Sequence, residues 1–352
     1  MNLGPDWSQR RSAGGAEPAR PEAGVPVEPR VSTATLVRLA VAAGLTALIL
    51  WKIDAAAAGR ALAAADWRWI VAAVALVLVD RALNAYRWLV LLRSVAAGAA
   101  LRLAEILRVF FVSTFVGTFL PGSVGGDAVR SVALARQGVA MADSVASVFV
   151  DRVFGTLSIL LVAAGAVWFA PSSAPGWLAP VTVLMAVAGV AGVVIGLYSE
   201  GAERLAAGLL GRFTRGKLQK AGTNLLRSLR RYAHSSGALW NVLASSIAVQ
   251  MLRIAQAWML GLSLGLDPGF TAYLVHIPVI LVVMLLPISV SGIGTSQAAF
   301  IWLFGTSGIA EPDAFALSVL FVALGAVGNL PGGVLYAMGG LHGRKPSGLP
   351  LR

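Results

Sequence analysis

The side chains of this sequence that could do chemistry are charged and amide groups set inside long apolar stretches. A charge that faces lipid is costly, so we expect these groups to face the protein interior or a water-filled cavity. Arginine is the commonest of them, and its guanidinium group is a planar fork that matches a phosphate. We therefore predict a substrate-binding set, with no catalytic residue, made of Arg87, Asp127, Arg130, Asp151, Arg152, Gln250 and Arg253.

Some of these residues have a second interpretation. Arg87 lies within about two helical turns of the expected cytoplasmic end of its span, so it could snorkel to the surface instead. Asp127 or Asp151 could equally form a structural ion pair with one of the arginines. Arg253 lies near the middle of its expected span, and that position favours a function.

Two breaks interrupt the apolar helices: the first contains Pro121, Gly122, Ser123, Gly125 and Gly126, and the second contains Pro287, Ser289, Gly292 and Gly294. A helix that ends inside the membrane frees backbone groups, and the unwound turn needs glycine. The N-terminus of the next helix carries unpaired N–H groups, which suit an anionic headgroup. We expect Asp127 to cap the helix after the first break. The expected caps after the second break are Ser291, Thr295 or Ser296.

The two breaks belong to a repeat within the chain. Pro121 and Pro287 are 166 positions apart, and the same shift carries one polar stripe onto another. The first stripe is Asp80, Asn84 and Arg87, and the second is Ser246, Gln250 and Arg253. Two halves are therefore expected, at about 69–170 and 238–338, and the loop charges place them upside down relative to each other. An inverted repeat in a membrane protein points to a carrier with its site between the halves.

The composition of the chain predicts that these helices lie in a lipid bilayer. Apolar residues make up 57% of the chain and charged residues only 12%. Several apolar runs reach the roughly 20 residues that a helix needs to cross a hydrocarbon core of about 30 Å. We predict an all-α polytopic integral membrane protein with about six full spans and two re-entrant helical hairpins, arranged as an inverted repeat. The spans are expected at 34–51, 69–92, 142–170, 178–198, 238–264 and 314–338, and the short hairpin helices at 109–120, 127–139, 270–286 and 296–304.

The membrane domain is expected at 33–340, between a disordered tail at 1–32 and a basic tail at 341–352. The net charge of +12 lies mainly in loops, and the most basic segment, 199–236, is expected to be an amphipathic helical segment on the cytoplasmic face. Because the charge marks the cytoplasmic side, no nucleic-acid partner is expected. The same bias predicts a multi-pass protein of the bacterial plasma membrane with both termini in the cytoplasm.

Motifs for an enzyme, a metal or a cofactor are not found in the sequence. The chain has no cysteine, and its three histidines are scattered, so no metal site is expected. It contains no P-loop, no Gly-x-Ser-x-Gly and no dinucleotide fingerprint, so we expect neither a cofactor nor a catalytic activity.

Four segments match a known pattern: 84–88 (NAYRW), 119–130 (FLPGSVGGDAVR), 150–155 (VDRVFG) and 286–294 (LPISVSGIG). They resemble the lysylphosphatidylglycerol synthase transmembrane (flippase-like) family, over about 35–340. In the namesake proteins this membrane unit precedes a soluble aminoacyl transferase domain and is thought to flip the aminoacylated lipid. The resemblance implies the membrane unit without that soluble domain, so lipid synthesis is not expected. After the second break the family pattern is usually Gly-x-Arg-Glu, whereas this chain has Gly294-Thr295-Ser296-Gln297.

The resemblance and the repeat together predict a lipid translocase that moves a phospholipid or a lipid-linked headgroup, with membrane lipids as its partners. The arginines would attract a lipid phosphate, and the two hairpins would gate opposite faces. One alternative is a non-transporting membrane partner of a separately encoded lipid-modifying synthase. Another is a membrane glycosyltransferase that uses a lipid-linked sugar. Its catalytic carboxylate would lie in the first outward loop, which contains Asp54 and Asp66.

Overall fold

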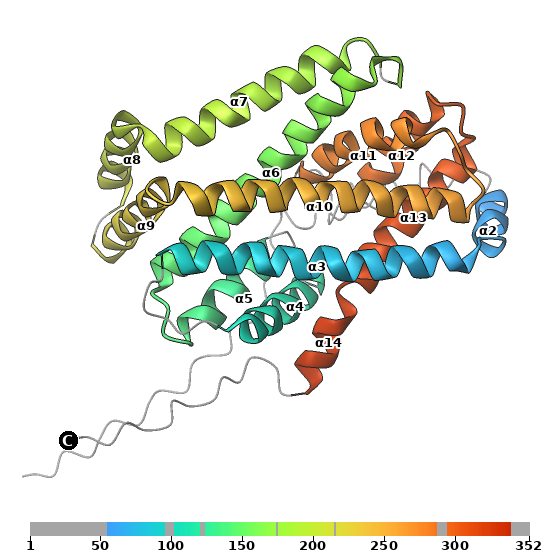
Figure 1. Cartoon of the computed structure of the whole chain (residues 1–352). Helices are drawn as coiled ribbons and strands as arrows, with labels where there is room; N and C mark the ends of the chain where they lie inside the picture. The colour runs from blue at the N-terminus through green and yellow to red at the C-terminus, as the bar shows by residue number, and fades with distance from the viewer. Residues whose placement is uncertain are drawn as a thin grey trace, which may run out of the picture.

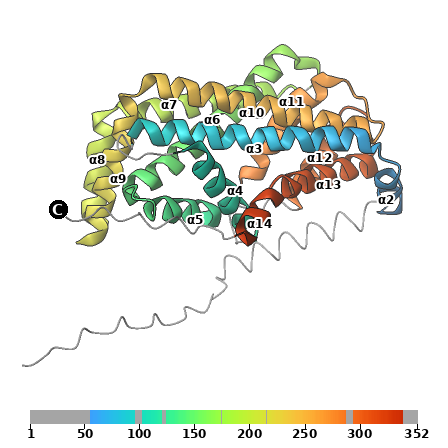
Figure 2. The ribbon, with the colours of Figure 1, turned by 60° about the horizontal axis from the view of Figure 1, so that its bottom comes forward.

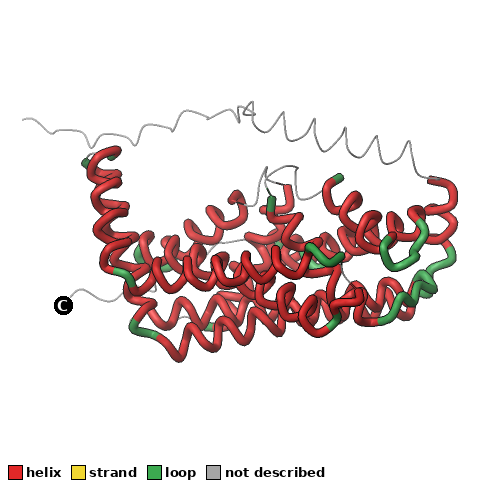
Figure 3. The backbone as a smooth tube through the Cα atoms, turned by 90° about the horizontal axis from the view of Figure 1, so that it is seen from above, coloured by secondary structure: helices red, strands yellow, loops and turns green. Residues whose placement is uncertain are grey.

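The structure is a computed structural model that describes residues 55–95, 102–119, 124–173, 175–214, 216–286 and 294–338. Nearly all of these residues are helical, no strand is found among them, and short loops join the helices (Figure 3). The predicted all-α class is confirmed. Outside the described residues lie the predicted span at 34–51, both predicted tails, Asp54, Pro121, Gly122, Ser123, Pro287, Ser289, Ser291 and Gly292.

Five helical segments in the described part of the chain are long and apolar enough to cross a membrane. They are α3 (Trp67–Val95), α6 (Met141–Phe169), α7 (Leu178–Tyr198), α10 (Ser236–Ser263) and the pair α13–α14 (Glu311–Ala337). Each coincides with a predicted span, so the chain is a multi-pass membrane protein. Two short elements, α2 (Ala55–Ala63) and η1 (Pro171–Ser173), precede α3 and follow α6.

The long helices α3 and α10 form the centre of the bundle. Figures 1 and 2 show them side by side and antiparallel, and α6 packs against both. Each buries polar side chains partway along its length: Asp80, Asn84 and Arg87 on α3, and Ser246 and Gln250 on α10. In an apolar solvent such groups need partners inside the protein, so they determine which faces of the two helices meet.

Two pairs of short helices complete the bundle: α4 (Leu103–Phe119) with α5 (Val124–Ala135), and α11 (Phe270–Leu285) with α12 (Thr295–Gly305). Within each pair the two helices pack against each other. The first pair lies toward the C-terminal end of α3, and the second lies toward the opposite end of the bundle (Figures 1 and 2). Hairpins of an inverted repeat would occupy such positions, and the symmetry of the two halves stays a prediction.

Apolar side chains anchor each short pair to the long helices. Trp88 and Leu92 of α3 pack with Ile106 of α4 and Leu134 of α5. A second core joins α10, α11, α12 and α13, with Ile254, Tyr273, Phe300, Phe304 and Leu317 among its buried residues. The polar residues of α3 and α10 therefore lie between two well-packed apolar regions.

The first pair of short helices starts earlier than predicted. Gly125, Gly126 and Asp127 lie in the first turn of α5, so the predictions that these glycines interrupt the helix and that Asp127 caps it are wrong. Gly126 allows a close helix crossing instead. A Cβ atom at Gly126 would lie 3.2 Å from the Cα atom of Gly117 on α4 and 3.0 Å from the carbonyl oxygen of Ser113.

At the second break, Gly294 precedes α12 with a positive φ of 85°, which glycine adopts without strain. The expected cap by Thr295 or Ser296 is wrong. Thr295 is the first residue of α12, and the Gln297 Oε1 atom accepts the Gly294 N–H at 2.6 Å and the Ser296 hydroxyl at 3.1 Å. Gln297 thus supplies the acceptor at the helix start, at the position where the resembling family has glutamate.

The last predicted span consists of two helices, α13 (Glu311–Val327) and α14 (Leu330–Ala337), rather than one. Pro331 causes this difference, because its ring clashes with the carbonyl four residues earlier and it has no N–H to donate. The short α14 packs against α4. A Cβ atom at Gly332 would lie 2.0 Å from the carbonyl oxygen of Phe111, so only glycine fits this crossing.

We expect Gly332→Ala to lower the free energy of unfolding by about 1–3 kcal/mol, because the added methyl group must push α14 away from α4. Gly325→Ala is the matched control on α13, where a Cβ atom would meet nothing within 4 Å. Its effect should be neutral or stabilising by about 0.5–1 kcal/mol. Thermal unfolding in detergent micelles measures both variants, and equal midpoints would contradict the close crossing.

The basic segment predicted at 199–236 forms two helices, α8 (Glu200–Phe213) and α9 (Lys217–Ala233), at one end of the bundle (Figure 1). The α9 helix is amphipathic, as predicted. Its residues Leu225, Leu229 and Tyr232 join a core with α3 and α6, and Arg231 pairs with Asp143 near the start of α6. This end of the bundle is therefore tied to the long helices by both apolar packing and an ion pair.

Candidate functional site

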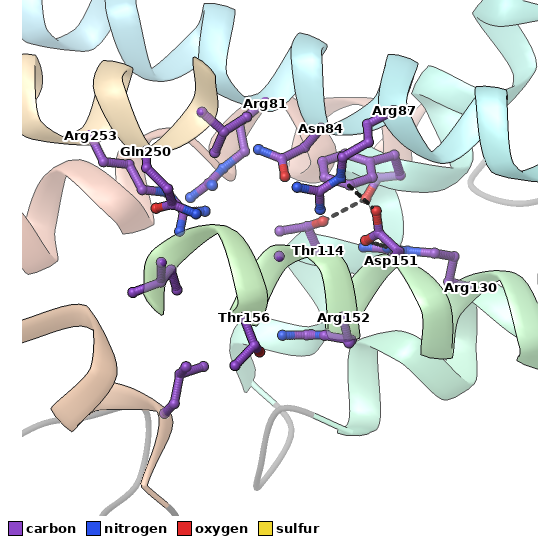
Figure 4. A pocket seen from close by; sticks show the side chains of 15 residues that line it. Arg81, Asn84, Arg87, Thr114, Arg130, Asp151, Arg152, Thr156, Gln250 and Arg253 are labelled. Carbon is purple, nitrogen blue, oxygen red and sulfur yellow. Dashed lines mark hydrogen bonds and ion pairs between the residues drawn. The ribbon is translucent and has the colours of Figure 1, made fainter. Parts of the chain in front are cut away.

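Two adjoining cavities with charged side chains in their walls lie among the long helices. The smaller has a volume of about 230 Å³ and is lined mainly from α3, α6 and α10. The larger has a volume of about 530 Å³ and extends to α5, α13 and the start of α14. Both are lined by Arg81, Thr114, Arg130, Arg152 and Arg253, so we refer to them together as the central cavities. Figure 4 shows the labelled side chains converging on this space from α3, α6 and α10, together with Thr114 from α4 and Arg130 from α5.

Positive charge is in excess at the central cavities. Among the described residues that line them, five are arginine and three are aspartate, a formal surplus of two positive charges: Arg81, Arg87, Arg130, Arg152 and Arg253 with Asp80, Asp127 and Asp151. In the low-dielectric interior of a protein, such a surplus attracts an anion much more strongly than it would in water. The electrostatics of the site therefore favour an anionic ligand.

Asp151 on α6 lies at the centre of a buried ion cluster. Its Oδ1 atom accepts a hydrogen bond from Arg87 Nε at 2.7 Å, and its Oδ2 atom lies 3.7 Å from Arg130 NH1. The Arg130 guanidinium also lies over the rings of Trp88 and Phe110, 4.9 and 4.6 Å from their centroids. Because Arg87 is buried and paired here, the interpretation that it snorkels to the surface is wrong.

Asp80 on α3 holds a second cluster. Its Oδ2 atom accepts a hydrogen bond from Arg81 NH1 at 2.9 Å, and its Oδ1 atom lies 3.4 Å from Arg253 Nε. Arg81 Nε also donates to the side-chain oxygen of Asn329 at 3.1 Å, and the Asn329 amide donates to Thr118 of α4 at 3.0 Å. Arg81 and Asn329 were not predicted from the sequence.

Asp127 and Arg152 form the third ion pair, between α5 and α6. The Nε and NH2 atoms of Arg152 donate to the two carboxylate oxygens of Asp127 at 2.9 and 3.1 Å. Half of the Arg152 side chain is exposed, in contrast to the buried Arg87 and Arg130. All three aspartates thus pair with arginines, which agrees with the structural role that the sequence left open for Asp127 and Asp151.

The two polar stripes of the predicted repeat contact each other reciprocally. Arg87 donates to Ser246 at 2.9 Å, and Arg253 lies 3.4 Å from Asp80. Ser246 is the counterpart of Asp80, and Arg253 is the counterpart of Arg87, both by the shift of 166 positions. Reciprocal contacts of this kind are typical of two surfaces related by a twofold axis. They favour the predicted inverted repeat at its centre.

Three residues that line the central cavities have a buried polar atom without a hydrogen-bond partner in the part of the chain that the structure describes. The Gln250 Oε1 atom and the Gln256 Nε2 atom are buried without one, although Gln250 Nε2 donates to Ser158 at 3.0 Å. Asp80 Oδ1 also accepts no hydrogen bond. A buried polar group without a partner costs free energy, so these residues carry an uncompensated cost next to the central cavities.

All seven predicted substrate-binding residues line the central cavities: Arg87, Arg130, Asp151, Arg152, Gln250 and Arg253 line the smaller one, and Asp127 lines the larger one. Asp66, the described carboxylate of the loop that was predicted to face outward, is exposed and accepts the Arg68 N–H at 2.9 Å at the start of α3. Among the described residues, no group of three or more histidine or acidic side chains could hold a metal ion.

The chain matches one family model along most of its length. No curated protein matches it. The model of the lysylphosphatidylglycerol synthase TM region matches residues 35–332, a range that includes every residue of the central cavities. This match confirms the resemblance carried by the four sequence segments, and it links the chain to lipid metabolism or translocation. The chain belongs to the lysylphosphatidylglycerol synthase TM region family.

Proposed function

We propose that this protein binds the phosphate of an anionic phospholipid, or of a lipid-linked headgroup, in the central cavities and moves the lipid across the bacterial plasma membrane. The observation that carries the proposal is the surplus of two positive charges held between membrane-spanning helices. A buried cation is costly unless an anion compensates it. The phosphate of a lipid is the anion that a membrane offers to such a site.

The buried and the partly exposed arginines of the central cavities would have different roles. Arg87 and Arg130 are buried and share Asp151, so they hold α3, α5 and α6 together and supply a positive field. The Arg253 side chain is 26% exposed and its contact with Asp80 is long, at 3.4 Å, so it is available to a ligand. Arg152 is half exposed and presents a fork already aligned on two carboxylate oxygens. A phosphate would take over that fork with similar geometry.

The two pairs of short helices would act as gates. They lie toward opposite ends of the bundle, so each could open the central cavities to one face of the membrane (Figure 1). The sequence has no nucleotide-binding motif, so the transfer would be facilitated or driven by a gradient. The basic helices α8 and α9 would lie on the cytoplasmic side, where anionic lipids attract arginine and lysine.

Transfer of a labelled lipid across vesicles tests the proposal. Purified protein is reconstituted into phosphatidylcholine vesicles that contain a trace of fluorescent phosphatidylglycerol or fluorescent phosphatidylcholine, and an impermeant reductant bleaches the outer leaflet. Protein should speed the bleaching of the inner phosphatidylglycerol more than that of phosphatidylcholine. Unchanged rates across a broad panel of headgroups would overturn the proposal. Lipid that stays bound through purification without being moved would support the role of a membrane partner for a lipid-modifying synthase.

A further inference from the structure

Arg152 lies at the junction of three cavities. It lines both central cavities and also a third one, of about 270 Å³, between α6 and α7. Thr156, one helical turn further along α6, lines the smaller central cavity and the third one. Figure 4 shows both side chains on α6 next to the central space. The central cavities and the space between α6 and α7 are therefore neighbours that share these side chains.

The third cavity is an apolar groove beyond these two residues. Its other lining residues are Val153, Leu157 and Leu160 from α6, and Gly189 and Val193 from α7. Only Arg152 and Thr156 supply polar side chains among these lining residues. We call this space, with its seven lining residues, the α6–α7 groove. A groove with a cation at one end and aliphatic walls matches a molecule with an anionic head and a hydrocarbon chain.

Gly189 keeps the groove open. A Cβ atom at Gly189 would lie 3.2 Å from Leu160 Cδ1 and 3.3 Å from Leu157 Cδ1, so any larger side chain would enter the groove. Most of α7 is exposed in the bundle, and Figure 1 shows it running along the outside, beside α6. Since lipid surrounds the outer helices of a membrane protein, the groove faces the acyl chains of the bilayer.

We propose that the α6–α7 groove holds an acyl chain of a phosphate-bearing lipid whose headgroup lies in the central cavities, and that Arg152 receives the phosphate at the entrance. This rests on the proposed function, because it takes the ligand to be a lipid. The phosphate exchanges with Asp127 as the partner of the Arg152 guanidinium, since both offer two oxygens to the same fork. The lipid then enters sideways between α6 and α7, and its chain never leaves an apolar environment.

Photo-crosslinking tests the groove independently of transport. Phosphatidylglycerol with a diazirine on its acyl chain is mixed into phosphatidylcholine vesicles that contain the full chain, and the crosslinked residues are mapped by mass spectrometry. We expect crosslinks to concentrate on Leu157, Leu160 and Val193. Arg152→Gln should lower them several-fold, and a diacylglycerol probe with the same diazirine chain but no phosphate should give few.

Gly189→Trp fills the groove and should remove most of these crosslinks. Gly192→Trp is the matched control on α7, because a Cβ atom there meets nothing within 4 Å. Gly189→Leu is a smaller filling change that serves if the tryptophan variant fails to fold, and Leu160→Ala should increase crosslinking by widening the groove.

Three outcomes of these experiments distinguish a failure of the groove proposal from a failure of the proposed lipid translocation. Crosslinks that spread over the outer face of α7 and ignore Gly189→Trp would overturn the groove, even if wild-type protein moves lipid. Groove crosslinks without any lipid transfer would uphold the groove as a lipid site while refuting translocation. Equal crosslinking by phosphatidylglycerol and by diacylglycerol, which has no phosphate, would remove Arg152 as the phosphate receptor, and with it the proposal.

Discussion

Replacing Arg253 with glutamine should slow the transfer of an anionic lipid by roughly tenfold to a hundredfold, because a charge-assisted hydrogen bond contributes about 1.5–3 kcal/mol. Arg253 is the partly exposed arginine that lies farthest from its carboxylate partner, 3.4 Å from Asp80. Its removal leaves Asp80 paired with Arg81 at 2.9 Å, so no buried charge is orphaned and the fold should survive. The reduction in rate would therefore report on the ligand.

The reconstituted vesicle assay measures this change, with two controls. Arg253→Lys keeps the charge but loses the planar fork, so its rate should lie between those of wild type and Arg253→Gln. Arg204→Gln removes an arginine from α8 whose side chain is 80% exposed and pairs with Glu200, so it should leave the rate unchanged. Equal rates for Arg253→Gln and Arg204→Gln would exclude Arg253 from the lipid site.

Replacing Asp151 with alanine should lower the free energy of unfolding by about 3–5 kcal/mol, because two buried arginines would lose their shared counter-charge. Arg87 and Arg130 are only 5% and 6% exposed, so little water can reach them to replace the carboxylate. Unfolding of the purified protein in mixed detergent micelles measures the loss.

Asp127→Ala is the matched control for this prediction. It removes the carboxylate that pairs with the half-exposed Arg152, and water can then solvate the guanidinium. The expected loss is below about 1 kcal/mol. Combining Asp151→Ala with Arg87→Met should recover part of the stability, since one buried cation leaves with its partner. Similar losses for Asp151→Ala and Asp127→Ala would contradict the view that the Asp151 cluster holds the bundle together.

The five described spans, and the position of the seven predicted residues at the central cavities, could be predicted from the sequence because both depend on strong local signals. An apolar run of sufficient length predicts a membrane helix, and a charge within such a run must find a partner inside the protein. The sequence could not pair the charges, because pairing depends on how α3, α5, α6 and α10 pack. Thus Asp151 and Asp127 could be predicted as site residues, but their arginine partners could not be chosen.

Arg81 and Asn329 line the central cavities but were not predicted to do so, because their sequence context indicates a site only weakly. Arg81 follows Asp80 on α3 and lies about 100° around the helix from it, so it is not part of the polar stripe of Asp80, Asn84 and Arg87. Its spacing of three from Asn84 was the available clue. Asn329 was not predicted because the apolar residues at 314–338 look like one continuous helix. Pro331 nevertheless indicates the helix break that precedes it. Asp127 was wrongly predicted as a cap because the helix extends through the glycines before it.

The bridge made by Asn329 ties the end of the last span to two other helices. Its side chain accepts from Arg81 of α3 and donates to Thr118 of α4, and it sits in the break between α13 and α14. An outward swing of α14 that carried Asn329 with it would break both hydrogen bonds, while Arg81 would keep its bonds to Asp80 and to the Gly325 carbonyl oxygen. The Asn329 amide therefore links the break in the last span to two other helices that line the larger cavity.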